Sequence, residues 1–389
     1  MKELSPFEAA QLADDIYDVQ NASRVDRFLD HPRFKKVEKS KPSPHQHLTA
    51  EVGGRILLNH RDGFGICAQG SDDGELFLIF RGTTMKNNGA DVLTDARIGI
   101  TRSTAGLPVH AGFQRCFTSM LPAIRVFLSA HNKRKKMVHC IGHSLGGAVA
   151  ALAADWVARN TLHLAKLYTF GAPRVGTEWF VKSTTAAIKS KHIHRVYHRT
   201  DPVPMVPLYP FMHAPYAQDG HYLHSSYPLT SGEAHKIGSY ITTIKKKKST
   251  WHTLSDVQEH AYTLDVAIES WLKSKSPVDA SSAAFWRWVD SALIYVLKKI
   301  TMTVIMSLQS ALVTTFTLAD KIAYILVKGI NLADNISIWV ENLMRKLMQA
   351  LCMKVAKAKE ELTHSLIRHV LVRITEKANR EARNALRQS

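Results

Sequence analysis

The sequence has few cysteines and no leader-like N-terminus, and both absences restrict where the protein is made. Its four cysteines among 389 residues form no CxxC pair, which excludes a disulfide framework and suits a reducing compartment. The first ten residues, MKELSPFEAA, contain no apolar core and no cleavage-site pattern. We therefore predict synthesis in the cytoplasm without a signal peptide. Peripheral membrane association and export by a route that needs no signal peptide both stay open.

Negative charge is also scarce. Asp and Glu number 33 against 51 Lys and Arg, so the formal net charge is +18. Such an excess favours a polyanionic partner. No zinc-finger spacing or RNA-binding aromatic signature accompanies it, so we predict an anionic membrane surface as the partner and no nucleic acid. The alternative is a solvated basic surface that keeps the protein in solution.

Short apolar runs alternate with amphipathic segments in the first two thirds of the chain. Runs typical of strands occupy residues 63–68, 76–80, 137–141, 167–170 and 193–197, and helical patterns occupy residues 5–29, 113–130, 146–159 and 177–190. Strands that alternate with helices predict a mostly parallel α/β sheet with flanking helices.

Beyond residue 276 the strand signals disappear, and glycine and proline become rare. Apolar residues recur every three or four positions in two stripes between residues 305 and 355, as on one face of a helix. We predict an α/β domain over residues 1–276 and a basic, amphipathic, all-helical region over residues 277–389. Residues 300–319 carry no charge, but their Ser, Thr and Gln favour a buried or interfacial helix over a membrane-spanning one.

The strongest local signal is Gly-His-Ser-Leu-Gly, which spans residues 142–146. A strand-like run precedes it and an alanine-rich helical run follows, which is the setting of a nucleophile elbow. Gly142 and Gly146 leave room for the sharp turn, and the turn presents Ser144 at a helix N-terminus, where N–H groups favour an anion. We predict Ser144 as a catalytic nucleophile and the backbone N–H of Leu145 as an oxyanion donor.

Five segments together resemble the class 3 lipases, the fungal triacylglycerol-lipase type of α/β-hydrolase, over about residues 5–270. They are residues 78–84, 109–113, the elbow, 168–176 and 200–204, in the family's order. The resemblance implies an α/β-hydrolase fold, a lipid-ester substrate and a Ser-His-Asp triad that needs no metal and no organic cofactor. It also implies Thr83 as the second oxyanion donor, with Asp95 supporting it.

In α/β-hydrolases the acid and then the histidine follow the serine along the chain. Asp201 comes after a strand-like run and before Pro-Val-Pro, so we predict it as the carboxylate that orients the histidine. The candidate histidines after Asp201 are those at positions 213, 221, 224, 235, 252 and 260. The resemblance favours His260, which precedes an amphipathic helix and has Tyr262 two residues later. His252 is the alternative.

These residues predict a serine hydrolase that cleaves carboxylic esters of membrane lipids, as a phospholipase A does. A triacylglycerol or diacylglycerol lipase is the alternative, and a non-enzymatic lipase-like scaffold that binds a membrane or a partner is the second. A catalytic unit that lacks a signal peptide and carries membrane-seeking helices also resembles antibacterial lipase effectors of bacteria. For such an effector we expect an inhibitor or immunity protein.

Overall fold

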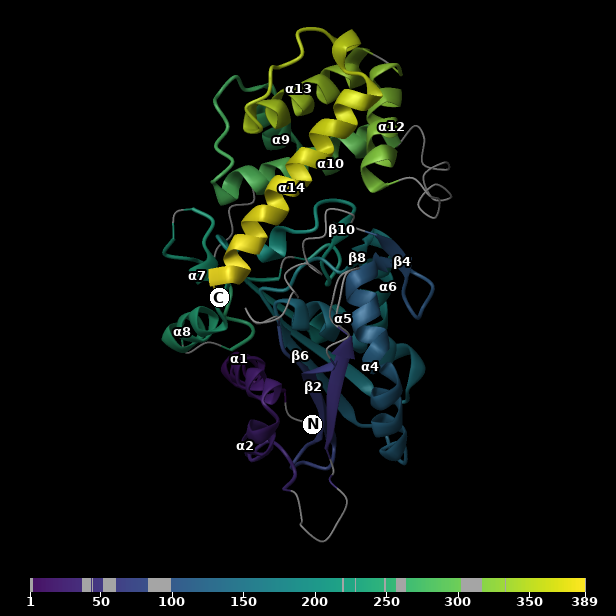
Figure 1. Cartoon of the computed structure of the whole chain (residues 1–389), viewed down its shortest axis with the longest axis vertical. Coiled ribbons are helices and arrows are strands. Elements are labelled where there is room, and N and C mark those ends of the chain that lie inside the picture. Colours follow the sequence, from purple (N-terminus) through teal and green to yellow (C-terminus); the bar gives the residue numbers. More distant parts are fainter. Residues whose placement is uncertain are drawn as a thin grey trace.

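The computed structural model describes residues 3–36, 43, 45–51, 61–82, 99–218, 220–227, 229–247, 250–256, 264–301, 317–332 and 334–388. A seven-stranded sheet lies at the centre of the α/β part (Figure 1), in the order β1-β2-β3-β6-β7-β9-β11. The strands are β1 Gln46–Glu51, β2 Arg61–Gln69, β3 Glu75–Phe80, β6 Met137–His143, β7 Leu164–Phe170, β9 Ile193–His198 and β11 His221–Leu223. From β3 to β11 neighbouring strands run parallel, whereas β1 and β2 pair antiparallel.

Helices cover both faces of this sheet. They are α1 Pro6–Asp15 and α8 Ile237–Lys247 on one face, and α4 Ala111–Ala130, α5 Leu145–Asn160 and α6 Glu178–Ile188 on the other. Side chains of β3 alternate between the two cores, with Leu76 and Leu78 on the α4–α5 side and Phe77 and Ile79 on the α1 side. The predicted fold class, an α/β-hydrolase sheet with flanking helices and a C-terminal helical region, is confirmed.

Short elements complete the α/β part. A second sheet has the order β10-β8-β5-β4, with β4 Ile100–Arg102, β5 Pro108–His110, β8 Gly176–Thr177 and β10 Phe211–Met212. The short helices are η3 Ser190–His192, η4 Val203–Met205 and α7 Gly232–His235. Both η4 and α7 belong to the candidate active site.

The predicted N-terminal helix over residues 5–29 is interrupted. Ser5 caps α1 in a capping box with Glu8, as its position suggested. The helix ends near Asp15, and the chain continues through the 3-10 turns η1 Ile16–Gln20 and η2 Ala22–Arg24 to the short helix α2 Val25–Leu29. Aspartates gather where α1 ends, and negative charge opposes the dipole at a helix C-terminus, which accounts for the break.

The helices described beyond residue 264 form a cluster at one end of the molecule (Figure 1). They are α9 Asp265–Lys273, α10 Ala283–Thr301, α12 Leu318–Ile330, α13 Asp334–Ala350 and α14 His364–Gln388, with the turn η6 Lys359–Glu361 before the last. Helix α9 packs against α10 and α13 although it precedes the predicted boundary at residue 276. The apolar faces of the cluster join the same core as α4 and α5.

The uncharged segment 300–319 falls mostly on residues 302–316, which lie outside the described residues. In the part of the chain that the structure describes, each helix is too short or too polar to span a bilayer.

Candidate active site

Ser144 lies at the sharp turn between β6 and α5. Its backbone has φ 55° and ψ −130°, a conformation that an L-residue rarely adopts. The Ser144 N–H donates to the carbonyl of Phe170 at 3.0 Å, and its carbonyl accepts from Gly147 at 2.9 Å. The strained residue is therefore fixed from both sides, at the N-terminus of a helix of 16 residues.

The two glycines of the elbow are needed because backbone passes close to them. A Cβ at Gly142 would lie 2.3 Å from the carbonyl oxygen of Gly146, and a Cβ at Gly146 would lie 2.2 Å from the carbonyl oxygen of Phe80. Neither neighbour is a side chain that could rotate away.

Asp201 follows β9 and lies fully buried beside the elbow. Its Oδ1 accepts from the Val203 N–H at 2.9 Å, and its Oδ2 accepts from the Tyr240 hydroxyl at 2.7 Å. Gly171 makes room for this carboxylate, since it has φ +55° and a Cβ there would lie 2.7 Å from Oδ2. The carboxylate is held on two sides and faces one further partner.

That partner is His235, the last residue of α7. Its Nδ1 donates to Asp201 Oδ2 at 2.9 Å, and its Nε2 lies 3.0 Å from Ser144 Oγ, in position to accept the hydroxyl proton. His235 and Asp201 are fully buried and Ser144 is 1% exposed. The three side chains form a continuous hydrogen-bonded chain from carboxylate to hydroxyl.

The histidine that the structure places between Asp201 and Ser144 is His235, whereas His260 was predicted for this role. His260 lies outside the described residues, and both contacts that the role requires are made by His235. His213 is engaged elsewhere, since it donates to a backbone carbonyl, and His252 is exposed. His235 was among the six candidates, but it lacks the following aromatic that favoured His260.

A second buried histidine supports the first. His143 Nε2 donates to the backbone carbonyl of His235 at 2.7 Å, so its Nδ1 accepts from the Tyr17 hydroxyl, also at 2.7 Å. Burial lowers the pKa of His143 to about 3, which keeps this ring neutral in the tautomer that the two contacts require. Tyr17 and Tyr240 were not predicted as site residues, because neither belongs to a local motif.

The predicted oxyanion hole is described in part. Leu145 is the first residue of α5, so its N–H is free of a helical partner and lies next to the serine. Thr83 and Asp95 lie outside the described residues. The strand end that leads to Thr83 is described, and there Arg81 is buried and donates through Nη1 to the carbonyl of Gly82 at 2.9 Å.

These residues together can perform nucleophilic acyl transfer. A serine hydroxyl, a histidine that can take its proton, a carboxylate that orients the histidine and an N–H at a helix N-terminus are the groups that this chemistry uses. Within the described residues, no three His, Cys, Asp or Glu side chains are grouped so that they could hold a metal ion.

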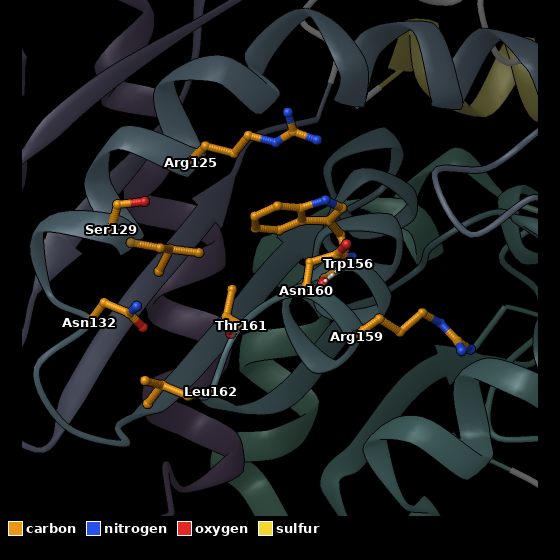
Figure 2. Close-up of a pocket in the computed structure, with 9 residues that line it drawn as sticks. Arg125, Ser129, Asn132, Trp156, Arg159, Asn160, Thr161 and Leu162 are labelled. Atoms are coloured by element: carbon orange, nitrogen blue, oxygen red, sulfur yellow. Dashed lines mark hydrogen bonds between the residues drawn. The ribbon is translucent and has the colours of Figure 1, made fainter.

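A separate surface pocket of about 350 Å³ lies at the C-terminal ends of α4 and α5 (Figure 2). Arg125 extends over the Trp156 ring at 5.6 Å, while Arg159 turns away to pair with Asp155 at 2.9 Å. Ser144 precedes the first turn of α5 and the pocket adjoins its last, about 24 Å along the helix. The pocket is therefore not the substrate site of this serine.

Residues 77–211 match the family Lipase (class 3). A secreted mono- and diacylglycerol lipase 1 of Fusarium solani is 36% identical over 105 residues, which cover 26% of this chain and 31% of that protein. Toxin TseL of Vibrio cholerae serotype O1 is 35% identical over 104 residues, which cover 26% of this chain and 15% of the toxin. The matched stretches thus span less than a third of either relative. Among solved structures, the nonglycosylated LIP2 lipase of Yarrowia lipolytica has a TM-score of 0.40 at 22% identity, over 60% of this chain and 87% of that one.

Proposed function

We propose that the protein is a serine hydrolase that cleaves carboxylic esters of membrane lipids, as a phospholipase A does, because residues 77–211 match the family Lipase (class 3). The observation that carries the proposal is His235, which lies 3.0 Å from Ser144 Oγ and 2.9 Å from Asp201 Oδ2. An oriented imidazole beside a serine hydroxyl is what makes that hydroxyl a nucleophile.

In the first half of the reaction, Ser144 Oγ attacks the ester carbonyl and His235 takes the hydroxyl proton. Asp201 holds the ring in position and stabilises the imidazolium that forms. The carbonyl oxygen becomes an oxyanion that accepts from the Leu145 N–H and, by the family resemblance, from Thr83. When the tetrahedral intermediate collapses, His235 returns the proton to the leaving alcohol and an acyl-serine remains.

In the second half, a water molecule attacks the acyl-serine. His235 takes a proton from this water and then gives it to Ser144 Oγ as the fatty acid leaves. Atoms balance without any cofactor, because one water is consumed for each ester bond that is broken. The protein ends the cycle in the protonation state in which it began.

The excess of positive charge supports a phospholipid substrate. With a net charge of +18, the protein is attracted to an anionic bilayer, where phospholipid esters are concentrated, more strongly than to neutral glyceride droplets. The Fusarium relative is named a mono- and diacylglycerol lipase, which supports glycerides as the second candidate substrate class.

One relative is named a toxin, and this name supports an antagonistic role in which phospholipid cleavage damages another cell. A protein with that role needs a partner that protects the producing cell from it. We therefore propose an inhibitor or immunity protein as a partner, with export by a route that needs no signal peptide.

Mass spectrometry of the products released from vesicles that contain both phospholipids and diacylglycerol tests the proposal. We expect free fatty acid and lysophospholipid from the wild type, and neither product from Ser144→Ala. If the products are fatty acid and monoacylglycerol without lysophospholipid, the protein is a glyceride lipase and not a phospholipase.

The same vesicles, loaded with a fluorescent dye, test the non-enzymatic alternative. An enzyme should cause leakage only when Ser144 is intact. Equal leakage caused by the wild type and by Ser144→Ala would identify a membrane-binding scaffold and reject the enzyme.

A further inference from the structure

The candidate triad is closed to solvent. Ser144 is 1% exposed, and Asp201 and His235 are 0% exposed. An ester as large as a phospholipid must bring its carbonyl carbon within bonding distance of Ser144 Oγ. Residues that now cover the triad therefore have to move before each reaction.

Helix α14 packs against two elements next to the triad. It contacts α7, which ends in His235, and η4, which begins two residues after Asp201. In Figure 1 the C-terminal end of α14 lies beside α7. No other described helix of the C-terminal cluster packs as extensively on either element.

The two halves of α14 are held very differently. The buried positions of the first half are Ile367, Val370, Leu371 and Ile374, and those of the second half are Ala378, Asn379, Ala382, Ala385 and Leu386. The first half is also tied to α12 by the ion pair of Arg368 with Asp320. Three alanines bury far less apolar surface than branched side chains do, so the second half detaches more easily.

Asn379 weakens the second half further. Its side chain is 1% exposed, yet neither its Nδ2 nor its Oδ1 has a hydrogen-bond partner. A buried amide without partners favours any state in which water can reach it. The closed position of this half-helix is therefore less stable than an apolar contact of the same size would make it.

The outer face of α14 carries a row of arginines. Arg373, Arg380 and Arg387 are exposed and lie seven residues apart, which places them about 10.5 Å from one another on nearly the same face. Within the described residues none of the three forms an ion pair. Glu376 is exposed between the first two, so the row keeps a net positive charge.

We propose that residues 377–387 of α14 cover the catalytic histidine, and that the arginine row on the outer face of α14 is where an anionic phospholipid membrane engages the protein and draws this cover away. The positive row complements phosphate-bearing headgroups, and it lies on the same helix as the weakly held contact. The inference rests on the proposed function, because the membrane that opens the site also supplies the ester.

Sedimentation with vesicles tests the docking surface. Each basic residue near an anionic leaflet strengthens binding about fivefold, so R373Q/R380Q/R387Q should bind phosphatidylglycerol-containing vesicles about 100-fold more weakly than the wild type. A matched control, K133Q/K135Q/K191Q, removes the same charge from exposed positions outside the C-terminal cluster. If both triple variants lose the same affinity for the vesicles, the arginine row is not the membrane-docking surface.

The rate at which a soluble fluorophosphonate labels Ser144 tests the cover. We expect phosphatidylglycerol-containing vesicles to speed the labelling of the wild type at least tenfold, and pure phosphatidylcholine vesicles to leave it unchanged. Leu386→Ala, which removes the largest apolar contact of the second half, should label faster without vesicles. Truncation after Glu376 should do so more strongly. Labelling of the folded Leu386→Ala variant at the wild-type rate, together with no vesicle effect on the wild type, overturns the proposal.

Failure of this proposal and failure of the proposed function give different results. Labelling that responds to vesicles, without lysophospholipid among the products, keeps the cover and rejects phospholipid as the substrate. If the protein releases lysophospholipid but vesicles do not change the labelling rate of Ser144, the phospholipase function stands and the proposal that α14 covers the site is rejected.

Discussion

Ser144 and His235 meet at a 3.0 Å contact, yet different interactions hold the two residues in place. Around Ser144 the backbone sets the geometry, because the residue has φ 55° and its flanking glycines lie against neighbouring carbonyl groups. Around His235 side chains set it, because Asp201 accepts from the ring and Tyr240 holds the carboxylate.

This difference predicts how substitutions around Ser144 and substitutions around His235 reduce activity. A backbone contact cannot be relieved by turning a side chain, so a change at the elbow should abolish activity abruptly. A chain of side-chain hydrogen bonds can lose one member and keep the rest, so each substitution around His235 should reduce activity only in part. The exception is His235 itself, which has no substitute.

The largest effect is expected from His235→Ala. The variant lacks the base, so kcat/KM for a soluble ester should fall by about 10⁴ to 10⁶. His260→Ala should keep activity within about threefold of the wild type, because the structure assigns its predicted contacts to His235. If His260→Ala lost more activity than His235→Ala, His260 would be the catalytic histidine, and the comparison of Ser144 with His235 would no longer apply.

The elbow side is tested by Gly146→Ala. The new Cβ would lie 2.2 Å from the Phe80 carbonyl, which displaces the start of α5 and with it the N–H of Leu145. We expect kcat to fall at least about 100-fold, as when one oxyanion donor is lost, and the free energy of unfolding to fall by about 1–3 kcal/mol.

A matched control for this substitution is Gly238→Ala in α8, where a Cβ would meet nothing within 4 Å. It should leave kcat unchanged and raise the free energy of unfolding by up to about 1 kcal/mol, since alanine is the better helix former. Near-normal kcat in Gly146→Ala would contradict the view that the elbow tolerates no change.

A smaller, graded effect is expected from Tyr240→Phe. It removes the hydroxyl that donates to Asp201 at 2.7 Å but keeps the ring, so kcat should fall about tenfold. The carboxylate keeps the Val203 N–H as its other donor and still orients the His235 ring, so KM should stay near the wild-type value.

Tyr324→Phe on the exposed side of α12 serves as the control for the same loss of a hydroxyl. If Tyr324→Phe loses as much kcat as Tyr240→Phe, the loss in Tyr240→Phe does not come from the contact with the carboxylate.

The same contrast explains how much could be predicted from the sequence. The strands around the elbow follow from short apolar runs and the helices from amphipathic patterns, and Ser144 lies in a contiguous motif. Asp201 was accessible because it follows a strand. His235 was not, because α7 has only four residues and its position depends on packing against distant parts of the chain.

The C-terminal region illustrates a second limit. In the described residues, α12 and α13 lie where the apolar stripes predicted helices, since a buried face recurs every three or four residues. The pattern could not tell what covers that face, and the faces of α10, α12 and α13 pack against one another and the hydrolase core. The break after α1 was missed for a related reason, because the apolar pattern continues past Asp15 where the charges end the helix.

The smallest effect at neutral pH is expected from His143→Gln, which probes the link between the two sides. Glutamine can still donate to the His235 carbonyl and accept from Tyr17, but it does not titrate. Burial holds the pKa of His143 at about 3 in the folded protein, against 6.5 in the unfolded chain. Between these values the unfolded chain binds the additional proton, so His143 lowers the free energy of unfolding as pH falls, by up to about 1.4 kcal/mol per pH unit. Above pH 6.5 both states are neutral and the stabilisation is fully present. Urea unfolding should therefore give the variant the same free energy of unfolding as the wild type above pH 6.5, and a less steep loss below that pH. If the free energies of unfolding of the two proteins fall equally steeply below pH 6.5, His143 is protonated in the folded protein. Tyr17 and the His235 carbonyl would then be joined in another way.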